Sequence, residues 1–307
     1  YGVLKFIHHA LKKEIGDEVS MKDIHAGKYS EQISKYTVTT ATDGNHGRSV
    51  AFGAKLFGCK CQIYIHSEVS SGRQKAMEDL EATVNRISGN YDASLQICIE
   101  DAGKNNWYVI SDTSYEGYTK YPRYIMAGYN VMAEEIIDQI KDRPLPTHVF
   151  LQGGVGSFPG AICGYFWEKF PGNNIKFVVV ESEHAPCLIR SAQNNQMTSV
   201  NIKQETMMAG LSCGEPSLLG WEILRSGTDD FITINDSSIP GLMRLLAKNN
   251  LKIEAGESSV AGLAGLIESM EDQKIAKAMG LNKESIVLLF GTEGATDPEI
   301  YRSIISE

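Results

Sequence analysis

Two short segments that follow strand-like sequence carry the groups best suited to chemistry. Residues 42–47 read Thr-Asp-Gly-Asn-His-Gly after the β-branched run 36–40, and residues 153–157 read Gly-Gly-Val-Gly-Ser after the apolar run 148–151. The first segment offers a carboxylate, an amide and an imidazole, which could move protons or hydrogen-bond a small ligand. The second presents backbone N–H groups at the expected start of a helix, a place that attracts phosphate. Together the segments could hold the two ends of one small anionic ligand.

Each segment also has a plain structural interpretation. The Asp43 and Asn45 side chains could bond local backbone in a turn that caps the following helix, and His46 could pack or cap. The glycines of residues 153–156 could form a simple tight turn. They lack both the Gly-Lys-Ser/Thr of a P-loop and the spacing of a dinucleotide-binding loop. Either segment by itself therefore leaves its role open.

Polar segments follow two other strand-like runs. Residues 111–118 read Ser-Asp-Thr-Ser-Tyr-Glu-Gly-Tyr, and Asp112 could act as a second acid or base. Thr292 lies in Gly-Thr-Glu-Gly at 291–294, where its hydroxyl could pair with a ring nitrogen. The alternatives are a solvated loop with a helix cap for the first segment and a cap of the last helix for Thr292.

Strand-like runs alternate with helical patterns along the chain, which predicts an α/β fold of mostly parallel sheets flanked by helices. We expect two lobes, a smaller α/β domain at residues 1–125 and a larger one at residues 126–307. Ligands of such sheets bind outside the carboxyl ends of strands, so the candidate loops predict a site in the cleft between the lobes. The expected strands are 36–40, 61–65, 83–87, 107–110, 149–151, 177–180, 231–234 and 286–290, and the expected helices are 1–13, 48–57, 72–80, 92–104, 124–140 and one from 157.

The composition is that of a globular protein with a substantial core, because the 307 residues are 42% apolar and 22% charged. A net charge of −9 argues against a nucleic-acid partner. We also expect no membrane partner, since no apolar run approaches the roughly 20 residues that span a bilayer. The six cysteines form no C-x-x-C pair, which favours buried thiols in a reducing cytoplasm and no metal site. The sequence leaves open whether Cys187 and Cys213 form a disulfide.

Taken together, the motifs resemble those of the 2,3-diaminopropionate ammonia-lyases, fold-type II pyridoxal phosphate (PLP) enzymes of the tryptophan synthase β-like superfamily. The resemblance covers essentially the whole chain. Its most specific parts are residues 42–47, Asp-Thr-Ser-Tyr-Glu-Gly-Tyr-Thr at 112–119, Met-Ala-Gly-Leu-Ser-Cys-Gly-Glu-Pro at 208–216, and Leu-Gly-Trp-Glu-Ile-Leu at 219–224.

The resemblance implies PLP as cofactor and a role for each candidate residue. Asn45 would contact the ring oxygen, and Thr292 would contact the ring nitrogen and leave it unprotonated. Asp43 and Asp112 would lie near the two amino groups of the substrate as acid and base groups, with Asp43 the base for the D-form. The phosphate would bind to Gly153, Gly154, Val155, Gly156 and Ser157, and the substrate would contact Thr42, His46 and Tyr91.

The implied activity is the α,β-elimination of 2,3-diaminopropionate, a small amino acid, to pyruvate and two ammonia. A homodimer is the implied assembly. In the family, a lysine in a Phe-Lys-x-x-Gly-Gly-Ser-Tyr segment forms a Schiff base with PLP and is the base for the L-form. Tyr1 matches the last residue of that segment, so we expect the lysine six residues upstream of Tyr1.

Two alternatives stay open. The loops are shared with threonine and serine dehydratases and other β-eliminating lyases, although dehydratases usually carry Ser where this chain has Asp43. A catalytically inactive homologue that binds PLP or an amino acid as a sensor is the alternative from another functional class.

Overall fold

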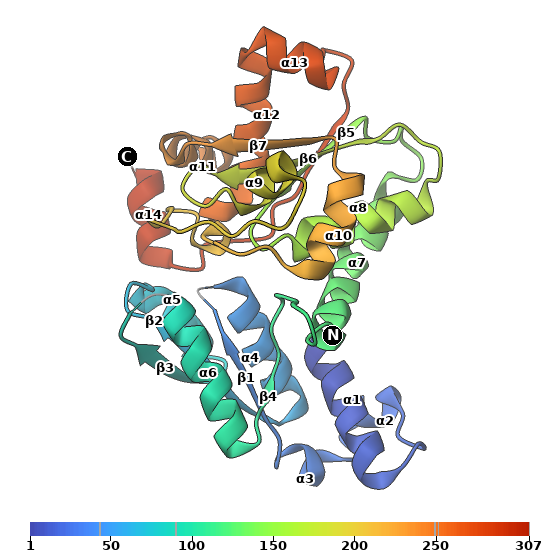
Figure 1. The fold of residues 1–307 in the computed structure, drawn as a ribbon, viewed down its shortest axis with the longest axis vertical. Helices are drawn as coiled ribbons and strands as arrows, with labels where there is room; N and C mark the ends of the chain where they lie inside the picture. The colour runs from blue at the N-terminus through green and yellow to red at the C-terminus, as the bar shows by residue number, and fades with distance from the viewer. Residues whose placement is uncertain (43, 90, 249, 251, 307) are drawn as a thin grey trace. The chain divides into compact units, whose positions relative to one another are not determined.

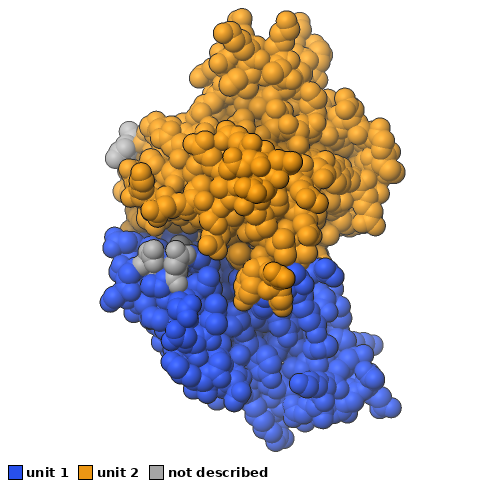
Figure 2. Space-filling model, in the orientation of Figure 1, with its two compact units in different colours: residues 1–112, 118–125 blue, residues 113–117, 126–307 orange. Residues whose placement is uncertain are grey.

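The computed structural model describes residues 1–42, 44–89, 91–248, 250 and 252–306. The chain forms two compact units, coloured separately in Figure 2. Unit 1 comprises residues 1–112 and 118–125, and unit 2 comprises residues 113–117 and 126–307. The division at residues 125 and 126 falls within one long helix, α7.

Figure 1 labels the helices and strands in chain order. In the first part of the chain these are α1 (Gly2–Ile15), α2 (Met21–His25), α3 (Ser30–Ile33), β1 (Thr37–Ala41), α4 (Asn45–Phe57), β2 (Lys60–His66), α5 (Ser71–Glu78), β3 (Thr83–Ile87), α6 (Tyr91–Asn105), β4 (Tyr108–Val109) and α7 (Lys120–Ile140). The remaining elements are β5 (His148–Gln152), α8 (Ser157–Lys169), β6 (Lys176–Ser182), α9 (Cys187–Asn194), α10 (Leu218–Gly227), β7 (Asp230–Ile234), α11 (Ile239–Lys248), α12 (Ala261–Glu271), α13 (Gln273–Met279), β8 (Val287–Leu289) and α14 (Pro298–Ser306).

Each unit contains one parallel sheet, and the two sheets have the same strand order within the described residues. The order is β3-β2-β1-β4 in unit 1 and β7-β6-β5-β8 in unit 2. Val38 of β1 is therefore in register with Cys61 on one side and with Tyr108 on the other. In each sheet the direction of strand addition reverses at the first strand, which makes the edge between β1 and β4, and that between β5 and β8, a topological switch point.

The unit 2 sheet is apolar on both faces because helices cover both. Along β5, Val149 and Leu151 pack in one core cluster with Ile162 of α8, while Phe150 packs in another with Ala261 of α12. The two clusters alternate because successive side chains of a strand point to opposite faces. The continuous apolar runs of β5 and β6 are the sequence signature of this double burial.

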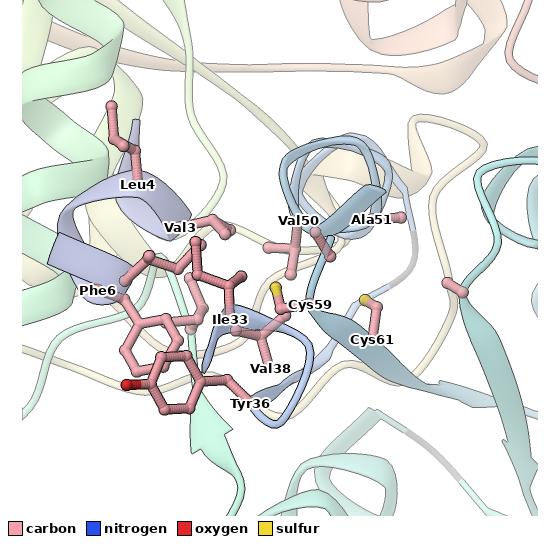
Figure 3. Packing of buried hydrophobic residues seen from close by; sticks show 14 of the residues in the cluster. Val3, Leu4, Phe6, Ile33, Tyr36, Val38, Val50, Ala51, Cys59 and Cys61 are labelled. Carbon is pink, nitrogen blue, oxygen red and sulfur yellow. The ribbon is translucent and has the colours of Figure 1, made fainter. Parts of the chain in front are cut away.

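The unit 1 sheet follows the same rule. Val38 and Ile63 pack against α1 and α4, whereas Tyr64 packs with Cys98 of α6 on the opposite face. Figure 3 shows the first of these clusters, in which the ring centroids of Phe6 and Tyr36 lie 5.8 Å apart. The α4 crossover from β1 to β2 and the α6 crossover from β3 to β4 thus cover opposite faces, as a reversal in the direction of strand addition requires.

The expected fold class, two α/β lobes with parallel sheets, is confirmed, and every expected strand is present. The helix boundaries differ in ways that have local causes. Helix α4 begins at Asn45, three residues earlier than expected, because the Thr42 hydroxyl accepts bonds from backbone N–H groups of its first turn. Helix α7 begins at Lys120 rather than 124, with Pro122 in the first turn, where no intrahelical N–H bond is needed.

None of the six cysteines forms a disulfide, so Cys187 and Cys213 are not cross-linked. Burial raises the pKa of the Cys59 and Cys163 thiols to about 12. The described residues contain no group of three or more His, Cys, Asp and Glu that could hold a metal ion. No helix in the same part of the chain is long and apolar enough to cross a membrane.

Glu181, near the end of β6, has a fully buried carboxyl group. Glu181 accepts hydrogen bonds from the backbone N–H groups of Leu188, at 2.8 Å, and Ile189, at 2.7 Å, in the first turn of α9. Burial raises the pKa of the Glu181 carboxyl to about 8, although these N–H groups oppose the shift. Glu181 therefore keeps its proton in the folded protein at a pH where an unfolded chain has lost it.

We expect the free energy of unfolding to fall as the pH rises from about 5 to about 8. The folded-state pKa lies above the unfolded value, so the stabilisation is complete below the unfolded pKa and is lost as the pH passes the folded one. Glu181→Gln should flatten this pH dependence in urea unfolding curves, whereas Glu222→Gln, at an exposed site on α10, should leave it unchanged. An identical slope in wild type and Glu181→Gln would contradict this account.

Candidate active site

The glycine-rich loop after β5 leads directly into α8. Gly156 caps the helix with φ of +94°, a left-handed conformation that glycine adopts at little cost. It has no side chain to cap the first turn, and that turn contains no acidic residue. Because Ser157 and Phe158 begin the helix, their N–H groups point out of its positive end, which suits an anion such as phosphate.

Close packing leaves no room for side chains along this loop. A Cβ on Gly153 would lie 2.8 Å from Val179, and one on Gly154 would lie 3.0 Å from the carbonyl oxygen of Gly210. Gly210 belongs to the 208–216 motif, whose 3-10 turn Ala209–Leu211 lies against the loop. The glycines thus allow the 208–216 motif and Val179 to pack directly against the loop backbone.

Helix α10 supports the loop from a second direction. The Ser217 N–H donates to the carbonyl oxygen of Val155 at 2.7 Å. A Cβ on Gly220 would lie 2.6 Å from the carbonyl carbon and oxygen of Gly156 and 3.0 Å from the nitrogen of Ser157. Gly220 belongs to the 219–224 motif, so the distinctive sequence of that motif corresponds to a helix that rests on the glycine loop.

Thr292 follows β8, at the switch point of the unit 2 sheet. Gln152, the last residue of β5, donates from Nε2 to Thr292 Oγ1 at 2.9 Å and to the carbonyl oxygen of Phe290 at 3.1 Å. This bond uses the Thr292 hydroxyl as an acceptor, so its proton remains available to a further acceptor. Gln152 also has a buried Oε1 with no hydrogen-bond partner among the described residues. The structure thus links Thr292 to the strand that carries the glycine loop.

The loop after β1 is organised by Thr42. Its Oγ1 accepts from the N–H of Gly44 at 3.2 Å and of Gly47 at 3.3 Å, so this hydroxyl bonds the backbone at the start of α4. The described part of the chain gives the Asn45 amide no hydrogen-bond partner. A Cβ on Gly47 would lie 2.3 Å from Cγ2 of Thr42, which fixes Gly at this position.

His46 connects this loop to the end of β4. Its Nε2 lies 2.7 Å from the carbonyl oxygen of Ile110 and must carry the proton, because a carbonyl only accepts. In the neutral ring Nδ1 is then an acceptor, and it lies 4.0 Å from Oδ2 of Asp112. The His46 side chain is 10% exposed and that of Asp112 is 26% exposed, so Asp112 is the more accessible member of the pair.

Two further predicted residues complete the survey of unit 1. Tyr91 begins α6 and packs, half-buried, against the Ala41 and Tyr64 cluster near the end of β1. Asp43 lies outside the described residues.

Sequence reasoning missed Gln152, Ser114 and Ser217, all of which are buried and hydrogen-bonded around the candidate loops. Gln152 could have been found from the sequence, because it is a polar residue at the end of an apolar strand. Ser114 and Ser217 meet across a separation of 103 residues, which no local pattern could have indicated.

Comparison with known proteins is consistent with this arrangement. The family model of the pyridoxal-phosphate dependent enzymes matches residues 19–291. Diaminopropionate ammonia-lyase of Escherichia coli K12 is 38% identical over 281 residues, which cover 89% of this chain and 70% of that protein. The Salmonella typhimurium protein of the same name is 35% identical over 99% of this chain and 78% of its own length.

A solved structure of diaminopropionate ammonia-lyase from Escherichia coli in complex with D-serine matches 99% of this chain and 78% of that chain, with a TM-score of 0.87 and 34% identity. The chain therefore belongs to the pyridoxal-phosphate-dependent enzymes, in the family of the diaminopropionate ammonia-lyases. Its fold is fold-type II and its cofactor is PLP.

The residues present fit this cofactor. The positive end of α8 suits the phosphate, because the Gly156 N-cap provides no side-chain cap and the first turn contains no acidic residue. The Thr292 hydroxyl has a proton to donate, as a ring nitrogen requires.

Replacement of Gly220 by Ala should weaken PLP binding. The added Cβ meets backbone rather than a flexible side chain, so the Gly156–Ser157 peptide must shift, at a cost of about 1–3 kcal/mol. PLP retained after gel filtration, measured by absorbance, and urea unfolding would detect this change.

Gly241→Ala is the matched control, because Gly241 also lies in a helix, α11, but a Cβ there meets nothing within 4 Å. It should keep PLP and gain up to about 1 kcal/mol of stability. Equal PLP retention in the two variants would show that Gly220 does not support the loop.

Proposed function

We propose that this chain is an ammonia-lyase that converts 2,3-diaminopropionate and water to pyruvate and two ammonia. The observation that carries the proposal is the 38% identity to the Escherichia coli enzyme of that name over 89% of this chain. The polar loops at the two switch points support it, because they supply groups suited to a phosphate, an aromatic ring and a substrate with two amino groups.

The cofactor would be held mainly by unit 2. The backbone of Gly153, Gly154, Val155 and Gly156, with Ser157, would bind its phosphate, and Thr292 would donate a hydrogen bond to its ring nitrogen. A neutral donor leaves that nitrogen unprotonated. In unit 1, the amide of Asn45 would contact the ring oxygen. The absence of any other bond to this amide within the described residues supports this role.

When bound, PLP supplies an electron sink for the charge left when Cα loses its proton. The acid and base groups would be Asp43 and Asp112. Asp112 Oδ2 lies 4.0 Å from Nδ1 of His46, so either group could deliver a proton to the leaving amine. Thr42, His46 and Tyr91 would contact the substrate.

Three further features are part of the proposal. The resemblance implies a homodimer, the cysteine usage favours a cytoplasmic location, and the alternation of strands and helices favours domains at residues 1–125 and 126–307.

Pyruvate release from DL-2,3-diaminopropionate tests the function directly. With saturating PLP, the purified protein should release pyruvate rapidly from this substrate and far more slowly from threonine or serine. Asp112→Asn should keep PLP but lower kcat by about a hundredfold or more, because it removes an acid–base group.

The other outcomes separate the alternatives. Faster release from threonine or serine would replace the proposal with a dehydratase. No release from any of the three, with PLP bound, would indicate an inactive homologue.

The role of Thr292 can be tested with a matched pair of variants. Thr292→Val keeps the shape but removes the hydroxyl, so we expect kcat to fall about tenfold, the equivalent of one hydrogen bond. Thr292→Ser keeps the hydroxyl and should stay within about twofold of wild type. If Thr292→Val turns over as fast as wild type, the hydroxyl does not contact the ring.

A further inference from the structure

Helix α10 begins with a serine that does not cap it. The side chain of Ser217, at the N-cap position, makes no capping bond to its own helix. Its Oγ instead accepts from the N–H of Ser114 at 2.9 Å and lies 2.7 Å from Ser114 Oγ. The free N–H groups of the first turn must therefore find acceptors elsewhere.

Ser114 supplies those acceptors from a distant part of the chain. The Leu218 N–H donates to the carbonyl oxygen of Ser114 at 2.8 Å, and the Leu219 N–H donates to Ser114 Oγ at 2.8 Å. Ser114 is 1% exposed and Ser217 is fully buried, so water cannot replace these bonds. We call this arrangement, in which Ser114 caps α10, the Ser114 cap.

The Ser114 cap acts on the same turn of α10 that supports the glycine loop. Ser217 donates its N–H to Val155, and Gly220 lies against the peptide between Gly156 and Ser157. A change in the first turn of α10 is therefore transmitted to the backbone of residues 155–157 through direct contacts.

We propose that Ser114 is a positioning residue for the cofactor phosphate. It acts through α10 and touches neither cofactor nor substrate. The proposal rests on the proposed phosphate role of residues 153–157. It also explains why the 112–119 and 219–224 motifs occur together, since one provides the cap and the other provides the capped helix.

The Ser114 cap also lies close in sequence to a proposed acid–base residue. Ser114 follows Asp112 by two residues in the same motif. The segment that would carry an acid–base group is thus tied by hydrogen bonds to the helix that shapes the phosphate loop. Such a link makes cofactor binding depend on a residue outside the cofactor loop.

The test measures PLP affinity in Ser114→Ala against a matched control, Ser269→Ala. Ser269 is 2% exposed and lies in α12 of the same unit, and it makes no contact with the loop or α10 that the structure records. Ser114→Ala should raise the dissociation constant for PLP about tenfold and shift the ³¹P resonance of the bound phosphate, while kcat at saturating PLP stays within about twofold. Ser269→Ala should change neither the affinity nor the resonance.

Ser217→Ala and the double variant complete the test. Because the two hydroxyls share one hydrogen bond, the effects of the single variants on PLP affinity should be less than additive in the double variant. Ser114→Thr keeps the hydroxyl and should recover most of the affinity. If Ser114→Ala does not fold, Ser217→Ala is used in its place with the same expectation.

Wild-type PLP affinity and an unchanged ³¹P resonance in the folded variants would overturn the proposal. An equal loss of affinity in Ser269→Ala would do the same, because the effect would then be one of general stability. The affinity and ³¹P measurements use PLP alone, so a failure to turn over diaminopropionate would count against the proposed function and not against the role of Ser114.

Discussion

In each sheet the first three strands add in one direction, and the fourth strand then adds on the other side of the first. The candidate site depends on this reversal in the direction of strand addition. Crossover helices on the two sides of the reversal cover opposite faces, as α4 and α6 do in unit 1 and α8 and α12 do in unit 2. The loops that follow β1 and β4, or β5 and β8, therefore diverge from neighbouring strand ends. All four polar segments identified in the sequence follow one of these strands. Within each sheet, the proximity of two of these segments is thus a consequence of strand order.

Close backbone packing is the second constraint on the site. A loop that presents its own N–H groups to a ligand cannot carry side chains on the side that faces the ligand. Neighbouring segments must therefore support it from the opposite side. Here the support comes from Gly210 and Gly220, each in a motif distant in sequence from the loop. Contacts between one backbone and another transmit small displacements directly, because neither side can change rotamer to absorb them. This explains how the sequence of α10 can influence the geometry of the glycine loop, the proposed phosphate site.

The sequence predicted the strands and the site loops because both are local signals. β-branched runs indicated β1 and β5, and Gly-rich or Asx-rich breaks indicated the turns after them. It did not predict where α4 begins, because the hydroxyl that bonds the start of the helix belongs to Thr42, one of several polar residues in the sequence that could have done so. It did not predict the Ser114–Ser217 contact either, since a bond across 103 residues depends on the tertiary fold. The sequence thus predicted the loops themselves but not the hydrogen bonds that connect them.

The polar groups around the loops divide into two kinds by their hydrogen bonds. Thr42, Ser114 and Ser217 use their hydroxyls on backbone N–H groups, and they hold the chain in place. Asn45 and Thr292 retain bonding capacity within the described residues, the first through its whole amide and the second through its hydroxyl proton. Burying a polar group without a partner is costly, so a group that retains bonding capacity is more stable where a ligand or water can meet it. Thr292 is exposed and Asn45 is partly exposed, so a ligand or water can reach both side chains. Ser114 and Ser217, in contrast, are buried. This difference in exposure separates the side chains suited to binding from those that support the backbone.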